Sequence, residues 1–318
     1  MQRTLLAESL LGDGRALQIV TAEAWDAQAL SEVILDAFGH RPLIDPPPPA
    51  LAETPETVTA ALTGGFGVLA LVDDQPAGVV IVSLEGATAG IHRVSVRPAF
   101  QRQGIASAMI AVVLESLALR GVHRVELTAR AEFPAVVAWW QRHGFVETSR
   151  EQTSLRLTRE LPVCVEARTA EETQDLGRRL AGLLRPGDLI IAAGDLGAGK
   201  TTLTQGIGAG LGVAGAVISP TFVLSRVHRP LADGPALVHV DAYRLGSAAE
   251  LYDLDLDASA ADAVTLVEWG TGIAEGLADD RLEIDIRRSL DPEDETRWIF
   301  LTPIGERWMT VRPMLEAL

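Results

Sequence analysis

A glycine-rich stretch in the second half of the chain holds the residues best suited to binding phosphate. It consists of Gly194, Asp195, Leu196, Gly197, Ala198, Gly199, Lys200, Thr201 and Thr202, and it fits G-x-x-x-x-G-K-S/T at every fixed position. Glycines allow backbone N–H groups to turn inward around a phosphate, and the ammonium group of Lys200 can reach its β- and γ-oxygens. The Thr201 hydroxyl is the expected Mg²⁺ ligand. We predict a nucleotide site here and expect Lys200 to face solvent; the alternative is a simple glycine-rich turn.

The use of basic residues supports this interpretation. Lys200 is the single lysine among 27 basic residues; all the others are arginines. A phosphate-binding loop needs a compact, flexible point charge, whereas the arginine guanidinium is a planar fork. The chain therefore places its one lysine where the chemistry requires it.

Two acidic residues follow the loop, each at the end of an apolar run. Asp241 ends the run 236–241, and Glu268 ends the run 263–268. Ligands of parallel sheets bind at the carboxyl ends of the strands, so we expect both carboxylates to converge on the phosphates. Ser219 and Thr221 lie in a segment expected to face the γ-phosphate. Taken alone, an acid at a strand end is more often a solvated residue or a turn cap, but the glycine-rich loop in the same sheet favours the phosphate site.

These motifs, GDLGAGKTT, SPTF, DAYR and VEWG, in this order resemble the TsaE (YjeE) ATPase family over residues 163–318. The resemblance implies ATP and Mg²⁺ as cofactors, with Thr201 and Glu268 on the metal and Ser219 and Thr221 in a switch loop. It also implies hydrolysis that depends on Lys200, Asp241 and Glu268. The remaining implied ATP contacts are Thr169 and Arg297.

The same resemblance implies a biological role. TsaE proteins work with TsaB and TsaD to place a threonylcarbamoyl group on adenosine 37 of tRNAs that read ANN codons, so contact with tRNA would be indirect. A small-molecule P-loop kinase is the alternative enzyme, for which Arg226, Arg229 and Arg244 are the candidate lid residues.

A second, shorter glycine motif lies in the first half of the chain. The strand-like run 91–98 leads into Gln101, Arg102, Gln103, Gly104, Ile105 and Ala106, which fit Q/R-x-x-G-x-G/A before a helix. A tight turn of backbone amides at a helix start is another phosphate cradle. A Gly144-Phe145 pair follows about forty residues later.

This arrangement resembles the GNAT acetyltransferase family over residues 16–160. The resemblance implies acetyl-CoA, with its pyrophosphate on the turn 101–106, its pantetheine along a strand containing Val94 and Val96, and transfer to an amine that the sequence does not identify. Trp140 stands where the family often has a tyrosine acid, and Phe133-Pro134 replaces a frequent asparagine. The acid or base candidates are then His143, Glu85 and Glu126. A degenerate domain that serves as a docking scaffold is the alternative.

The elements that must position these residues fall into two α/β groups. Strands over 67–72, 77–83 and 90–96, with helices over 24–38, 105–119 and 135–142, predict a mixed sheet in a domain spanning 1–160. After the junction near 159–162, alternating strands and helices predict a P-loop sheet in a domain spanning 163–318. The expected fold class is α/β with two domains.

Composition excludes several other classes of protein. The net charge is −16 over 318 residues, which argues against direct nucleic-acid binding because phosphate neutralisation needs clustered basic residues. No apolar run approaches the ~20 residues of a membrane helix. The single cysteine, Cys164, allows no internal disulfide, and with it we expect a cytoplasmic protein.

Overall fold

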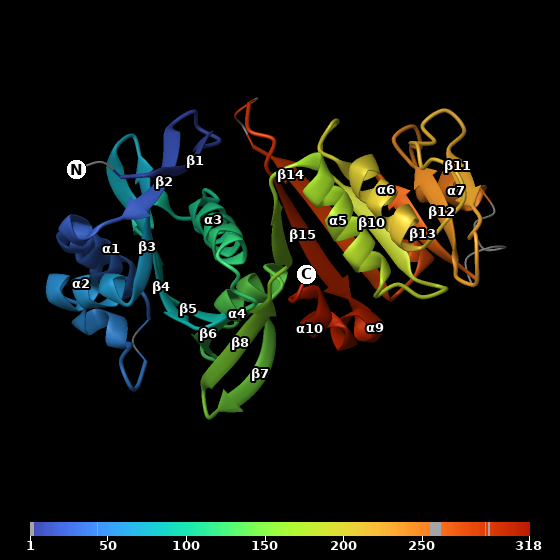
Figure 1. The fold of residues 1–318 in the computed structure, drawn as a ribbon. Coiled ribbons are helices and arrows are strands. Elements are labelled where there is room, and N and C mark those ends of the chain that lie inside the picture. The colour runs from blue at the N-terminus through green and yellow to red at the C-terminus, as the bar shows by residue number, and fades with distance from the viewer. Residues whose placement is uncertain (1–2, 43, 255–261, 290, 292) are drawn as a thin grey trace. The chain divides into compact units, whose positions relative to one another are not determined.

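The computed structural model describes residues 3–42, 44–254, 262–289, 291 and 293–318. Its chain divides into two compact units, Met1–Leu161 and Pro162–Leu318. Each unit contains one mixed β-sheet with helices on its faces (Figure 1). The two-domain α/β class expected from the sequence is confirmed.

The first unit has an eight-stranded sheet in the order β1-β2-β3-β4-β5-β6-β8-β7. Its strands are β1 (Leu5–Leu10), β2 (Ala16–Ala22), β3 (Gly65–Val72), β4 (Gln75–Glu85), β5 (Thr88–Val96), β6 (Arg124–Arg130), β7 (Val146–Glu151) and β8 (Ser154–Glu160). Its helices are η1 (Ala24–Asp26), α1 (Ala27–Gly39), η2 (Pro49–Ala52), α2 (Pro55–Thr63), η3 (Pro98–Phe100), α3 (Ile105–Leu119) and α4 (Pro134–Arg142). Helices α1 and α2 cover one face of this sheet and α3 covers the other (Figure 1).

Only the β5–β6 pair of this sheet is parallel, and its pairing is short. It runs from Thr88 opposite Arg124 to Gly90 opposite Glu126 and then stops, although both strands continue. Beyond Gly90, β5 and β6 are no longer paired along the described residues. This separation positions the first candidate site.

The expected helix over 24–38 begins differently in the structure. A 3-10 turn, Ala24–Asp26, precedes α1. The buried carboxylate of Asp26 accepts hydrogen bonds from the Glu23 amide at 3.0 Å and from Arg3 Nη2 at 2.6 Å. These contacts hold the entry turn tighter than an α-helix, which the apolar periodicity alone did not reveal.

The second unit has a seven-stranded sheet in the order β11-β12-β13-β10-β14-β15-β9. Its strands are β9 (Val163–Ala167), β10 (Leu189–Ala193), β11 (Ser225–His228), β12 (Ala236–Asp241), β13 (Ala263–Glu268), β14 (Arg281–Arg288) and β15 (Arg297–Ile304). Its helices are α5 (Ala170–Ala181), α6 (Lys200–Gly210), α7 (Ala248–Tyr252), η4 (Glu275–Leu277), α9 (Gly305–Thr310) and α10 (Arg312–Leu315). The central strands β12, β13, β10 and β14 are parallel.

Strand β10 is buried on both faces, which explains its continuous apolar sequence. Ile190 and Ala192 pack in the core formed with α5 and α6, whereas Leu189 and Ile191 pack in the core that includes Leu251 of α7. Helices α5 and α6 lie side by side over the first of these cores (Figure 1). The rigid centre of the sheet thus carries the glycine loop.

The two helices approach closely because glycines line their contact. A Cβ at Gly206 of α6 would lie 2.1 Å from the carbonyl oxygen of Gln174, and one at Gly177 of α5 would lie 2.5 Å from that of Leu203. Both positions therefore require the absence of a side chain. This packing fixes the start of α6, where the glycine loop ends.

Candidate functional site

The loop between β10 and α6 forms a cradle of backbone amides. Gly194, Gly197 and Gly199 all have positive φ angles, of 135°, 77° and 113°. A Cβ at Gly194 would lie 2.4 Å from the carbonyl oxygen of Ile286, so the loop needs glycine there for close packing. At Gly197 and Gly199 the space within 4 Å is open. The loop is thus anchored at its first glycine and open at the other two, as a phosphate cradle requires.

Lys200 is buried, and our expectation that its side chain faces solvent is wrong. Only 5% of the residue is exposed. Its Nζ donates hydrogen bonds to the carbonyl oxygens of Gly194 at 2.7 Å and Asp195 at 3.0 Å, and it lies 3.8 Å from the ring centroid of Trp269. Burial lowers the pKa of Lys200, and the nearby Glu268 and Asp241 carboxylates oppose that shift. The loop carbonyls thus hold the ammonium group over the cradle.

Thr201 and Glu268 are in direct contact. The Thr201 hydroxyl lies 3.0 Å from Oε1 and 3.2 Å from Oε2 of Glu268, which is 2% exposed at the end of β13. Parallel pairing of β10 with β13 sets Glu268 opposite Ala192, just before the glycine loop. The two residues expected to share a metal ion are therefore adjacent. Within the described ranges, no cluster of three His, Cys, Asp or Glu side chains could hold a metal by itself.

Asp241 lies beside Glu268 and holds the Ser-Pro-Thr loop. The two acids are register partners on β12 and β13. Oδ2 of Asp241 accepts hydrogen bonds from the hydroxyls of Ser219 at 2.7 Å and Thr221 at 2.6 Å, and Oδ1 accepts one from the Tyr243 amide at 3.1 Å. Burial acts to raise the pKa of Asp241, but these hydrogen bonds outweigh it and hold the pKa below its usual value. The loop is thus fastened to a carboxylate.

The two remaining ATP-contact candidates lie on neighbouring elements. Arg297 on β15 donates from Nε to the carbonyl oxygen of Ala198 at 3.0 Å, so it touches the glycine loop directly. Thr169 follows β9, whose Ala167 pairs with Arg297. Its hydroxyl accepts the Glu172 amide at 3.1 Å and caps α5. Its contact with a nucleotide stays a prediction.

In the first unit, the turn before α3 has the backbone geometry of a second cradle. Arg102 and Gly104 have φ angles of 60° and 84°, and a Cβ at Gly104 would meet nothing within 4 Å. The side chain of Gln101 donates to the Val96 carbonyl oxygen at 3.0 Å, and that of Gln103 accepts from Arg15 at 2.7 Å. Both glutamine side chains are engaged within the protein. Contact of a ligand with the backbone amides of this turn, through Ile105 and Ala106, stays a prediction.

Comparison with known proteins separates the two units. The model of the TsaE family, "Threonylcarbamoyl adenosine biosynthesis protein TsaE", matches residues 167–297. The chain is 60% identical over 139 residues to tRNA threonylcarbamoyladenosine biosynthesis protein TsaE of Streptomyces coelicolor, covering 43% of this chain and 94% of the relative. The protein of that name from Bacillus subtilis is 41% identical over 140 residues, covering 43% and 84%. The chain belongs to the TsaE family.

The first unit matches a different family. The model of the acetyltransferase (GNAT) family matches residues 33–145.

Among solved structures compared with the whole chain, YdiB of Bacillus subtilis aligns with 48% of this chain and 93% of its own at 34% identity and a TM-score of 0.39. The ribosomal-protein-S18-alanine N-acetyltransferase of Escherichia coli aligns with 45% and 93% at 19% identity and a TM-score of 0.39. The chain is therefore a fusion of an N-terminal GNAT domain with a C-terminal TsaE domain.

The TsaE domain contains a site residue that sequence reasoning missed. His239 on β12 lies with its Nε2 2.9 Å from Oε1 of Glu268, and both side chains are buried. Thr204 of α6 also approaches that oxygen, at 3.5 Å. A histidine inside the apolar run 236–241 was an available signal, because a buried polar group needs a partner. Which partner it meets depends on the pairing of β12 with β13.

The structure gives the surroundings of the acid and base candidates in the GNAT domain, whose roles stay predictions. The His143 ring is fixed between α4 and α3, with Nδ1 2.8 Å from the Trp139 carbonyl oxygen and Nε2 3.1 Å from the Ser107 hydroxyl. Glu126 forms an ion pair with Arg156 at 2.7 Å. Glu85 ends β4, at the hairpin end of the strand. Trp140 is buried against Phe145.

Proposed function

We propose that the TsaE domain binds ATP with Mg²⁺ at residues 194–202 and hydrolyses it in support of tRNA threonylcarbamoyladenosine biosynthesis. The observation that carries this proposal is the contact of Thr201 with Glu268 beside an anchored Lys200. A hydroxyl and one carboxylate are the protein ligands that Mg²⁺ typically takes at a triphosphate, with water and phosphate oxygens completing its shell. Bound Mg²⁺ would neutralise charge on the phosphates.

Besides Mg²⁺, residues of the TsaE domain supply the groups that bind the phosphates and orient water. The amides of the glycine loop and the ammonium group of Lys200 bind the phosphate oxygens. Arg297 holds the loop at Ala198. Asp241 orients a water molecule when Ser219 and Thr221 turn from it towards the γ-phosphate, and the loop returns after hydrolysis. Homologues of TsaB and TsaD are the proposed partners, in the cytoplasm, and they would carry most of the contact with tRNA.

A turnover experiment tests this proposal. ATP hydrolysis by the full chain is measured alone and with TsaB and TsaD homologues, together with the modified adenosine content of tRNA in a strain depleted of TsaE. Stimulated hydrolysis and restored modification are expected. Phosphate transfer from ATP to a metabolite would indicate a kinase, and the absence of nucleotide binding would indicate a scaffold.

We propose further that the GNAT domain is an acetyl-CoA-dependent amine acetyltransferase. The carrying observation is the separation of β5 from β6 after Gly90, next to the left-handed turn at Arg102 and Gly104. Turn amides would hold the pyrophosphate, and the strand that contains Val94 and Val96 would hold the pantetheine arm. Calorimetric titration of the full chain with acetyl-CoA tests this; no heat of binding at a folded GNAT domain would favour the scaffold.

A further inference from the structure

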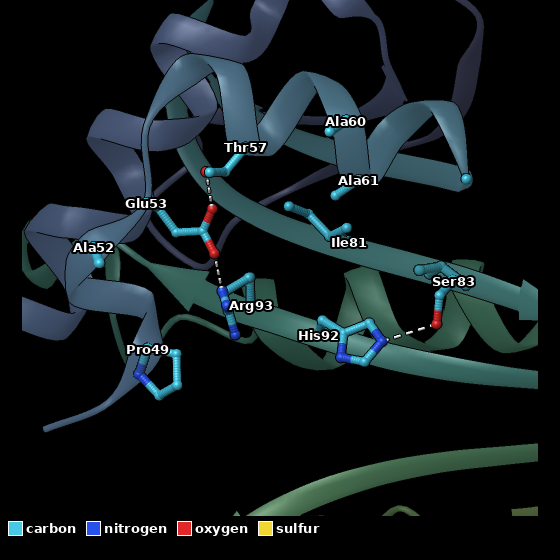
Figure 2. Close-up of a pocket in the computed structure, with 12 residues that line it drawn as sticks. Pro49, Ala52, Glu53, Thr57, Ala60, Ala61, Ile81, Ser83, His92 and Arg93 are labelled. Atoms are coloured by element: carbon cyan, nitrogen blue, oxygen red, sulfur yellow. Dashed lines mark hydrogen bonds and ion pairs between the residues drawn. The ribbon is translucent and has the colours of Figure 1, made fainter. Parts of the chain in front are cut away.

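The GNAT domain has a groove on the face of β4 and β5 that α2 covers (Figure 2). Its volume is about 540 Å³, within the range of small-molecule sites. Its walls are mostly small or apolar, and its charged lining residues are confined to Glu53 and Arg93. The apolar and small lining side chains are those of Pro49, Ala52, Ala60, Ala61, Ile81 and Val82.

The groove reaches the point where β5 leaves β6. The last pair of those strands is Gly90 with Glu126, and His92 lies two residues further along β5. The register of β5 with β4 shifts in the same region, where Arg93 has a φ of 53°. Ser83 and His92 lie on the face of Ile81, which belongs to the core beneath α1 and α2. Two lining residues, His92 and Arg93, therefore lie on β5 between its last pair with β6 and the stretch with Val94 and Val96 that is proposed for the pantetheine arm.

His92 is oriented in the groove by a single hydrogen bond. Its Nε2 lies 2.8 Å from the Ser83 hydroxyl (Figure 2). The pair needs glycine at position 90, because a Cβ there would lie 2.6 Å from the Ser83 oxygen and 2.7 Å from His92 Nε2. No hydrogen bond engages Nδ1 among the residues that the structure describes. In the tautomer in which Nε2 donates to Ser83, Nδ1 keeps a lone pair that can take a proton.

The surroundings keep this imidazole neutral. His92 is exposed as a residue, but partial burial of its ring, and then the charge of Arg93, lower the pKa of His92 below the ordinary value of 6.5. The charged groups facing it are Arg93 on its own strand and Glu53 from the segment before α2; β4 presents the neutral Ser83 and α2 the neutral Thr57. At neutral pH the ring is therefore a base.

Both oxygens of the one carboxylate in the groove are engaged. Oε1 of Glu53 accepts from Arg93 Nε, and Oε2 accepts from the Thr57 hydroxyl at 2.6 Å (Figure 2). The ion pair gives the groove no net charge. A ligand with a second ammonium group would find no unengaged carboxylate in the groove to pair with that charge, and an unpaired charge against apolar walls is costly.

We propose that this groove takes a primary amine on an uncharged body and that His92 is the general base that deprotonates it. This rests on the acetyltransferase function proposed above. Nδ1 of His92 takes one proton from the ammonium group, and the freed nitrogen lone pair forms a bond to the thioester carbonyl carbon. The carbon–sulfur bond then breaks, the second nitrogen proton passes to the leaving sulfur, and His92 releases its proton to water. The products are an N-acetyl amine and free coenzyme A.

The test compares three amines, of which n-pentylamine and cadaverine differ by one charge. The full chain is assayed with acetyl-CoA and n-pentylamine, cadaverine or a tripeptide amide that has a free N-terminus and uncharged side chains. We expect kcat/KM for n-pentylamine or for the tripeptide to exceed that for cadaverine at least ~10-fold. Whichever of these two substrates has the higher kcat/KM shows whether the acceptor is a small free amine or the amine of a peptide. Preference for cadaverine, or acetylation of none of the three by a chain that binds acetyl-CoA, would overturn the substrate class.

The role of His92 is tested with His92→Gln against His40→Gln, a matched change outside the groove. We expect kcat to fall roughly 100-fold in the first variant only, with the calorimetric Kd for acetyl-CoA unchanged in both. An NMR titration of the wild-type ring should give a pKa below 6.5, and kcat should fall only as the pH drops through that value. An unchanged kcat in His92→Gln would refute the proposal that His92 is the general base. If the wild type binds no acetyl-CoA, the proposed acetyltransferase function itself fails.

Discussion

At the residue scale, Lys200 holds the glycine loop closed and is also the residue proposed to bind phosphate. Its ammonium group closes the glycine loop through two carbonyl oxygens and also faces the space proposed for the phosphates. Two of its three protons are thus used within the protein. Replacing the residue must affect both the shape of the loop and the binding of ATP.

Lys200→Ala should weaken ATP binding by at least ~100-fold, because the cation for the phosphates is lost. The melting temperature without nucleotide should also fall, because the carbonyl oxygens of Gly194 and Asp195 lose their donor, while the domain stays folded on its intact core. Calorimetry and thermal melting with and without Mg-ATP measure both effects. Normal ATP affinity in a folded variant would contradict the phosphate site.

Glu268 illustrates why the choice of substitution matters. Its carboxylate contacts Thr201 and His239 inside the protein. Glu268→Ala leaves these polar groups without an acceptor, at a cost of about 1–3 kcal/mol each. We therefore expect Ala to lower the melting temperature as well as the activity.

Glu268→Gln keeps the shape of the side chain and removes the charge. We expect Mg-dependent turnover to fall ~100-fold in this variant while the Kd for ATP changes less than tenfold. A steady-state assay over a range of Mg²⁺ concentrations, beside ATP calorimetry, measures the difference. An equal loss of binding and turnover would argue against the metal role.

At the element scale, the loop that contains Ser219 and Thr221 depends on β12. Asp241, at the end of that strand, accepts both hydroxyls. Hydrogen bonds to a charged group contribute about 1.5–3 kcal/mol each. Asp241→Asn should therefore raise hydrogen exchange across residues 218–224 at least ~10-fold, with no change in β12 itself. Unchanged exchange in the loop would show that other contacts hold it.

The contact of α5 with α6 gives a second prediction at this scale. Gly206→Ala would place a methyl group 2.1 Å from the Gln174 carbonyl oxygen, so the helices must separate. We expect a loss of about 1–3 kcal/mol in the free energy of unfolding, measured by urea denaturation. Gly234→Ala is the control, because its nearest neighbour would lie at an ordinary 3.8 Å.

At the scale of the whole molecule, the chain is two units with separate cores, Met1–Leu161 and Pro162–Leu318. None of the helices in the described ranges is long and apolar enough to span a membrane. A ligand stabilises the folded state to which it binds. We therefore expect two calorimetric unfolding transitions, one raised by Mg-ATP and the other by acetyl-CoA. A single transition raised by both ligands would contradict independent units.

Features built from residues that are contiguous in the chain could be predicted from the sequence. The glycine loop, the turn before α3 and the bounds of α3 follow from neighbouring residues, because backbone conformation and helix periodicity are local properties. The resemblance to two families rests on the same local motifs, and the comparisons confirm it.

The tertiary structure alone decided the contacts between strands. The pairing of β12 with β13 sets Asp241 beside Glu268, and that of β4 with β5 brings Ser83 to His92. The burial of Lys200 likewise follows from how the loop folds back over its own side chain. The pairing register of two strands decides which of their side chains meet, but it leaves the apolar pattern within each strand the same. The periodicity of the sequence therefore could not reveal these contacts.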